Sequence, residues 1–292
     1  AVGFLIDDID YSGQGGIATT FDVDQIEVHR GPQGSRIGSN AMAGLIYIKT
    51  KEPTEAFEGV SEITTGTYGT INSGVAFGGP SQIDGLTYRI VLRKDYSDGF
   101  RKNLFSGKSD TSKKNESTFR LKVNWKVNTE STLKFLVTQI NLDDPADIWT
   151  IDGSLNTLSD RPGMDSQKTN AYGIRFFHIL ENFEFQSLTS MTDTDVVLSY
   201  DADWGNPSTH SPYIYDYFSE TLRFRETISQ EFRLLSNKAD FNSNKRNEWV
   251  VGMNFFESNE KNLKKDDGIY GDPSDPYSPY VSESSSSSKF DI

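Results

Sequence analysis

The chain alternates apolar and polar residues with a period of two, and this pattern constrains its fold most strongly. In residues 119–128 every odd position is apolar and every even position is polar. Similar alternation occurs at 86–93 and 249–255. Successive side chains of a β-strand point to opposite faces, so these segments predict strands with two distinct faces. No apolar run approaches the roughly 20 residues of a membrane helix, which excludes a helical membrane protein.

The pattern predicts about nine strands, each close to the ten residues expected of a tilted transmembrane strand. They lie near residues 57–67, 70–78, 85–96, 116–127, 131–142, 169–180, 183–198, 226–236 and 247–258. The strand at 131–142 is less regular than the others, because its apolar positions change face partway.

The connections between these strands alternate in length. The connections at 81–85, 128–131 and 181–182 are tight, whereas those at 97–115, 143–168, 199–225 and 259–292 are long and polar. Short turns at one rim and long loops at the other are typical of outer-membrane barrels. A soluble β-sandwich also alternates, but it accounts neither for this asymmetry nor for the many Arg and Lys residues at polar positions.

We therefore expect an all-β fold, a partial antiparallel transmembrane β-barrel. Bacterial barrels have an even number of strands, and plugged ones have about 22, so about nine strands are expected to be part of a larger barrel. Both ends of the chain are expected to be truncations, and no strand is expected after the five serines at 284–288.

The composition agrees with a barrel and excludes other classes. Only 35% of the residues are hydrophobic although 12% are aromatic, and a barrel needs apolar residues only at alternate positions. The net charge of −13 argues against a nucleic-acid partner, which requires Lys and Arg. The chain has no cysteine, which excludes disulfide scaffolds and thiolate metal sites.

Residues 21–51 predict a small folded insert ahead of the barrel. Alternation at 25–30 predicts a strand, and Gly31-Pro32-Gln33-Gly34 suits a type I turn. A second strand leaves at 45–48. The candidate turn residues are Gly31, Pro32, Gln33, Gly34, Gly38 and Gly44, and the glycines allow backbone angles that are closed to other residues. The GxxxxGK[ST] pattern of a phosphate loop is absent.

These residues resemble a known family. The sequences IEVHRGPQG at 26–34, GSNAMAG at 38–44 and IYIKT at 46–50 resemble the end of the plug domain of TonB-dependent outer-membrane receptors, and FLIDDI at 4–9 resembles the preceding plug strand. The resemblance implies that residues 1–52 are the C-terminal part of a small α+β plug and that 53–292 are the N-terminal part of a 22-stranded barrel.

The resemblance also implies roles for two charged residues of this segment. Glu27 and Arg30 match plug residues that hold the plug against the barrel. A charge-assisted pair between Arg30 and a barrel carboxylate gives this role a physical reason.

The family resemblance implies uptake of a scarce ligand through the outer membrane of a Gram-negative bacterium, with energy from the inner-membrane TonB complex. A ferric siderophore is the expected ligand, and cobalamin, haem or an oligosaccharide are alternatives. The box that contacts TonB lies upstream of the plug in the family and has no counterpart here. Outer-membrane lipid is expected around the barrel.

The rival hypotheses are a passive porin or structural barrel and a secreted β-sandwich enzyme or lectin. No cofactor or catalytic group is expected.

The interval between Arg175 and Arg223 has no Lys or Arg and is rich in acidic and aromatic residues. Aromatic loop residues can stack on a siderophore catechol or a sugar ring. The candidate ligand-binding residues are Trp149, Tyr200, Trp204, His210, Tyr213 and Tyr215. The alternative for each is an aromatic anchor at the lipid interface. No metal site is expected, since the histidines are far apart and the acidic run at 143–147 lacks calcium-loop spacing.

Overall fold

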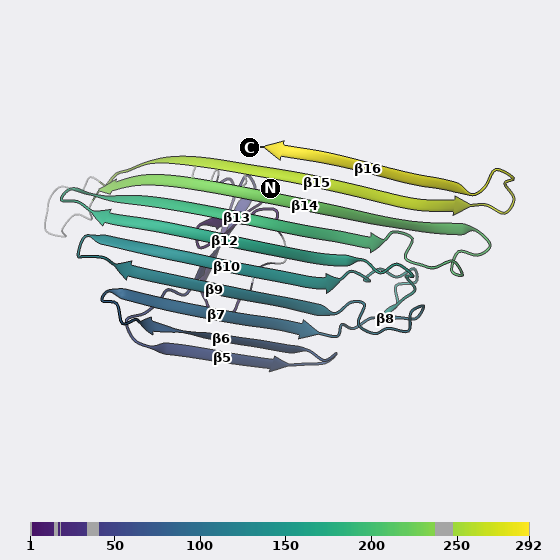
Figure 1. Cartoon of the computed structure of the whole chain (residues 1–292), viewed down its shortest axis with the longest axis horizontal. Helices are drawn as coiled ribbons and strands as arrows, with labels where there is room; N and C mark the ends of the chain where they lie inside the picture. The colour runs from purple at the N-terminus through teal and green to yellow at the C-terminus, as the bar shows by residue number, and fades with distance from the viewer. Residues whose placement is uncertain (1, 15–16, 18, 34–40, 237–247, 292) are drawn as a thin grey trace.

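The computed structural model describes residues 2–14, 17, 19–33, 41–236 and 248–291. These residues form a four-stranded sheet in the order β2-β1-β4-β3 and a ten-stranded sheet in the order β16-β15-β14-β13-β12-β10-β9-β7-β6-β5. Figure 1 shows the ten strands side by side, with the four-stranded sheet behind them. We call residues 2–52, which contain the four-stranded sheet, the insert, and the ten-stranded sheet the wall.

All regular elements of the described residues are strands, so the expected α+β insert consists here of strands and turns. The insert strands are β1 (Val2–Ile6), β2 (Ile9–Asp10), β3 (Val23–Arg30) and β4 (Gly44–Thr50). The wall strands are β5 (Glu58–Thr65), β6 (Ile71–Pro80), β7 (Leu86–Ser97), β9 (Lys114–Lys126), β10 (Ser131–Pro145), β12 (Met164–Ile179), β13 (Phe183–Asp201), β14 (Ile214–Ser236), β15 (Val250–Gly271) and β16 (Tyr280–Asp291). Within the described residues, no helix is long and apolar enough to cross a membrane.

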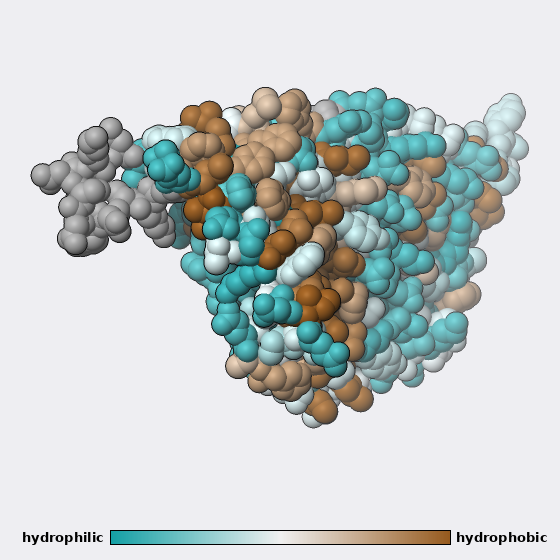
Figure 2. Space-filling view, turned by 60° about the vertical axis from the view of Figure 1, so that its left-hand side comes forward, coloured by the Kyte–Doolittle hydropathy of each residue, from teal (hydrophilic) through white to brown (hydrophobic). Residues whose placement is uncertain are grey.

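The wall has one face toward the insert and one face away from it, as the alternation predicts. On the outer face, Phe135 lies directly between Val123 and Ile174 of the two neighbouring strands, and the exposed fractions of Phe135 and Ile174 are 38% and 48%. On the inner face, Ala76 and Val91 are buried beneath Phe21 of the insert. Figure 2 shows hydrophobic residues exposed among hydrophilic ones over the visible surface, as expected of a wall whose outer face contacts lipid.

The insert packs against β10 and β12 through an apolar core, and this packing explains the irregular sequence of β10. Ile9 and Tyr11 of the insert are 2% and 1% exposed, and they cluster with Leu136 and Ile140 of β10. Because Leu136 and Ile140 point inward whereas Phe135 points outward, β10 carries apolar residues on both faces. The change of face at 131–142 therefore marks the place where the insert lies against the wall.

The wall contains ten strands rather than the nine expected, and the later strands are longer than expected. The region after 258 was expected to be a loop without a strand, but β15 continues to Gly271 and β16 pairs with it from Tyr280. Every residue of β16 is exposed, and the five serines pair with residues 262–266, which are polar except for Leu263. Both faces of this hairpin are mostly polar, so the sequence carries little period-two hydrophobic signal there, although the backbone ladder is complete.

The two rims of the wall differ as the sequence predicts. The tight turns 81–85, 127–130 and 180–182 lie at the left of Figure 1, whereas the connections 98–113, 146–163, 202–213 and 272–279 lie at the right. Two of the long connections carry short strands that the sequence did not indicate: β8 (Lys102–Asn103) pairs in parallel with β11 (Asn156–Thr157). Asn103 is fully buried and donates a hydrogen bond to Asp147 at 2.9 Å.

Candidate functional site

A buried ion pair fastens the start of β3 to the wall. Asp22 accepts hydrogen bonds from Nε and Nη2 of Arg89 at 2.9 and 2.5 Å, and Nη2 of Arg120 lies 3.7 Å from its carboxylate. The Asp22, Arg89 and Arg120 side chains are 0%, 3% and 5% exposed. Alternation on β7 and β9 turns both guanidinium groups toward the insert. A bidentate, charge-assisted contact of this kind is strong and fixes geometry.

A second contact centres on Lys122 of β9. Its Nζ donates to Asp7 at 3.0 Å, to the Thr50 carbonyl at 3.1 Å and to Glu52 at 2.9 Å, and Glu52 also accepts from Lys134 at 2.8 Å. Burial acts to raise the pKa of Glu52, but the two ammonium groups lower it by more, so the pKa lies well below its usual value. Glu52 is therefore ionised at neutral pH, and it links two wall strands to the end of the insert.

A third contact lies at the turn between β1 and β2. Nη1 of Arg175 on β12 lies 3.1 Å from Asp8, whose carboxylate also accepts a hydrogen bond from Tyr47 at 3.0 Å. Asp7 and Asp8 adopt positive φ angles of 50° and 62°. Aspartate tolerates this left-handed conformation better than most residues, and the turn brings both carboxylates to the wall.

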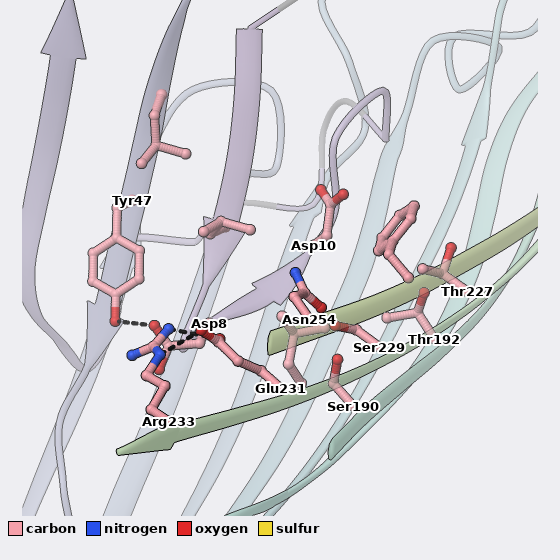
Figure 3. Close-up of a pocket in the computed structure, with 14 residues that line it drawn as sticks. Asp8, Asp10, Tyr47, Ser190, Thr192, Thr227, Ser229, Glu231, Arg233 and Asn254 are labelled. Atoms are coloured by element: carbon pink, nitrogen blue, oxygen red, sulfur yellow. Dashed lines mark hydrogen bonds and ion pairs between the residues drawn. The ribbon is translucent and has the colours of Figure 1, made fainter. Parts of the chain in front are cut away.

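A cavity of about 110 Å³ lies between the insert and strands β13 to β15. Asp8, Ile9, Asp10 and Tyr47 line it from the insert, and Figure 3 shows Asp8, Asp10 and Tyr47 facing a row of wall side chains. The wall contributes the hydroxyl groups of Ser190, Thr192, Thr227 and Ser229, together with Glu231, Arg233, Asn254 and Phe256. The cavity is therefore mostly polar on its wall side, and it is a gap between insert and wall rather than a pocket within either.

The predicted contact residues Glu27 and Arg30 lie on β3, which is the edge of the insert sheet opposite β2. Glu27 accepts a hydrogen bond from His29 at 2.7 Å, and the side chain of Arg30 is exposed. Within the described residues neither contacts the wall. Their predicted role stays a prediction, and the contacts of the described wall come from the acids named above.

The predicted turn residues are partly described. Gly31 has a φ of 86°, and the Gln33 amide donates to the Ala41 carbonyl at 2.9 Å, which closes the loop beyond Pro32. Gly44 begins β4 with a φ of 156°, and a Cβ atom there would lie 2.7 Å from the His29 carbonyl oxygen. The predicted residues Gly34 and Gly38 lie outside the described residues.

The structure brings the predicted aromatic residues together in two groups at the loop rim. The rings of Trp149 and Tyr200 lie 4.9 Å apart, and those of His210 and Tyr215 lie 5.2 Å apart. Trp204 is 40% exposed in a left-handed conformation with a φ of 61°, and Tyr213 is 47% exposed. Their role in ligand binding remains a prediction. Among the described residues, no group of three or more His, Asp or Glu side chains is placed to hold a metal ion.

The sequence did not single out the insert acids or their partners. Asp22 and Arg89 lie 67 residues apart, and Asp7 and Lys122 lie 115 apart, so no local spacing links them. The available signal was the recurrence of Arg and Lys at polar positions of the wall strands. That recurrence predicts a basic inner face, but not the acids that meet it.

No family model matches the chain. Over 111 residues, 38% of this chain, it is 32% identical to the pesticin receptor of Yersinia pestis, and it spans 16% of that protein's length. The crystal structure of the ferric yersiniabactin uptake receptor FyuA from Yersinia pestis superposes with a TM-score of 0.72 at 17% identity, covering 99% of this chain and 43% of that chain. The ferripyoverdine receptor of Pseudomonas aeruginosa superposes with a TM-score of 0.60 at 14% identity, over 99% of this chain and 41% of that chain.

These relatives are receptors rather than enzymes, and they carry the same arrangement of insert and wall. The similarity to solved structures extends along nearly the whole chain. The expected all-β partial barrel is therefore confirmed. The chain is similar in sequence and fold to TonB-dependent outer-membrane siderophore receptors, and it spans less than half of the length of each of the three proteins named above.

Proposed function

We propose that the full-length protein takes up a ferric siderophore through the outer membrane of a Gram-negative bacterium with energy from the TonB complex. The observation that carries this proposal is the folded insert held on the inner face of a strand wall by ion pairs, two of which, Arg89–Asp22 and Lys122–Asp7, are buried. A passive pore needs no such obstruction. The names of the similar proteins, which include a ferric yersiniabactin uptake receptor and a ferripyoverdine receptor, support the ligand class.

Within this proposal, residues 1–52 act as part of a plug and 53–292 as part of the barrel. Glu27 and Arg30, on the edge of the insert away from β2, contact the barrel in the full-length receptor. The aromatic residues at the loop rim, Trp149 with Tyr200 and His210 with Tyr215, form part of the first binding surface for the ligand. Stacking on such rings suits the flat aromatic groups that many iron chelators carry.

Uptake of radiolabelled iron tests the function. Iron-starved cells that express the full-length protein as their only receptor are given ferric catecholate, phenolate and hydroxamate chelates, with haem, cobalamin and an oligosaccharide as comparisons. We expect uptake of at least one ferric chelate, and its loss in cells without TonB or after addition of a proton uncoupler. Uptake that continues unchanged in both conditions would instead support the passive pore.

A further inference from the structure

The inner face of the wall is divided into two parts by the way its cations are paired. On β7, β9, β10 and β12, the cations Arg89, Lys122, Lys134 and Arg175 pair with acids of the insert. Separating the insert from these strands would leave the buried ammonium group of Lys122 without a counter-charge, because Asp7 and Glu52 both belong to the insert, whereas Arg89 keeps Glu58 of β5. Removing one partner of a buried pair is strongly unfavourable, because the other charge stays buried and unpaired. We call β7 to β12, together with β6, where Ala76 lies beneath Phe21 of the insert, the anchored side.

On β14 and β15 the cations pair with acids of the wall itself. Arg223 and Arg225 both pair with Glu260, and Arg233 pairs with Glu231 on its own strand. Arg225 and Arg223 reach the insert only at the carbonyl oxygens of Ser12 and Gly13. The insert can therefore leave these strands while every one of these cations keeps its counter-charge.

Among the described residues, the insert contacts β13 through a pair of neutral groups, since Thr194 donates to Gln14 at 3.1 Å. The cavity described above already separates the insert from Thr192, Thr227 and Ser229. Figure 3 shows these hydroxyl groups facing the turn after β1. We call β13 to β15 the open side. Water can replace the hydrogen bonds that hydroxyl and carbonyl groups lose there, at little cost in free energy.

We propose that the insert separates from the open side first while it remains tethered to the anchored side, and that the ligand passes between the insert and β13 to β15. This inference rests on the proposed uptake function for the identity of the cargo, but the order of separation does not. The passage has hydroxyl and amide groups, and its cations Arg223, Arg225 and Arg233 already have counter-charges in the wall. Such a surface suits a polar, hydrated chelate, because these paired cations would not trap it.

Two single cysteine variants of the full-length protein in detergent test the order of separation, since the chain has no native cysteine. Thr192→Cys lies on the open side and Ala76→Cys on the anchored side, and the two native side chains are 1% and 0% exposed. At moderate urea concentrations that leave the barrel intact, we expect a maleimide to label Thr192→Cys at least about tenfold faster, because local opening governs the labelling of buried groups. Equal rates, or faster labelling of Ala76→Cys, would overturn the proposal, and neither result depends on transport.

Cross-linking then tests the passage itself. A short bis-maleimide, whose two C=C bonds each add one thiol, joins Asp10→Cys to Thr192→Cys on the open side, and Phe21→Cys to Gly74→Cys on the anchored side, where the residue 74 Cβ position lies 2.9 Å from the Phe21 ring. The iron uptake of each double-cysteine variant before cross-linking serves as the control for that variant. We expect the open-side link to abolish iron uptake and the anchored-side link to preserve most of it. The reverse pattern refutes the passage, whereas absence of uptake before cross-linking refutes the proposed function and leaves the labelling result valid.

Discussion

Replacing Asp22 by asparagine is the sharpest test of the contact between insert and wall. The substitution keeps the side-chain volume but removes the charge that faces Arg89 and Arg120, all three groups being at most 5% exposed. Arg89 keeps Glu58 at 2.8 Å, whereas Arg120 loses a carboxylate that lies 3.7 Å from its Nη2. Removing one partner of a buried pair costs about 3–5 kcal/mol, so detachment of the insert becomes roughly a thousandfold more favourable at about 4 kcal/mol.

Asp24→Asn, two residues along the same strand, is the matched control. Asp24 pairs with Lys49 at 3.1 Å, but the two side chains are 50% and 44% exposed, so the pair is worth at most about 1 kcal/mol. The assay is urea-induced release of the insert in the full-length protein, followed by protease cleavage of the insert while the barrel stays resistant. A midpoint for Asp22→Asn that equals the midpoint for Asp24→Asn would refute the reasoning that buried charge fastens the insert.

Three further predictions follow from individual residues. Because the pKa of Glu52 is lowered from 4.5, its contribution to insert attachment is complete above pH 4.5 and is lost as the pH falls through the lowered value. Glu52→Gln should therefore make insert release less dependent on pH in the same assay. A pH profile of release that is the same as for the unmodified protein would contradict this role. Gly44→Ala should destabilise the insert by about 1–3 kcal/mol, because its new methyl group meets the His29 carbonyl oxygen, and unaltered protease resistance would argue against the strain. Trp149→Ala should weaken binding of a ferric chelate about two- to tenfold in a fluorescence titration. The control is Tyr277→Ala, because Tyr277 is 82% exposed on another loop and its removal should leave the affinity unchanged. Equal losses of affinity in the two variants would exclude a specific role of Trp149 in binding.

The wall was predictable from the sequence wherever one face meets lipid and the other is polar. β9 follows this rule, since Arg120 is buried against the insert and Leu121 lies on the opposite face of the strand. The rule fails where a strand meets something other than lipid and water. β10 is apolar on both faces because the insert covers Leu136, and β16 is polar on both faces because it pairs beyond any apolar region.

The contacts of the site were less predictable than the strands that carry them. A basic inner face could be inferred from Arg89 and Lys122, since cations at inward positions need counter-charges. Which acids supply them depends on the docking of the insert, and that docking joins residues as distant as Asp8 and Arg175. Long-range pairing of this kind leaves no periodic trace in a single sequence.

β14 and β15 are long, and their length places their loop ends far from the apolar band of the wall. β14 has 23 residues, and at ~3.4 Å per residue it is ~75 Å long. With a tilt of ~40° it rises ~60 Å along the membrane normal, whereas the apolar band of such barrels is ~25 Å tall. Apolar residues of β15 are concentrated at 250–256, and charged residues dominate at 257–267. With the apolar band at 250–256, the opposite ends of β14 and β15, where the rings of Tyr215 and Tyr270 lie 6.4 Å apart, stand well clear of the acyl chains.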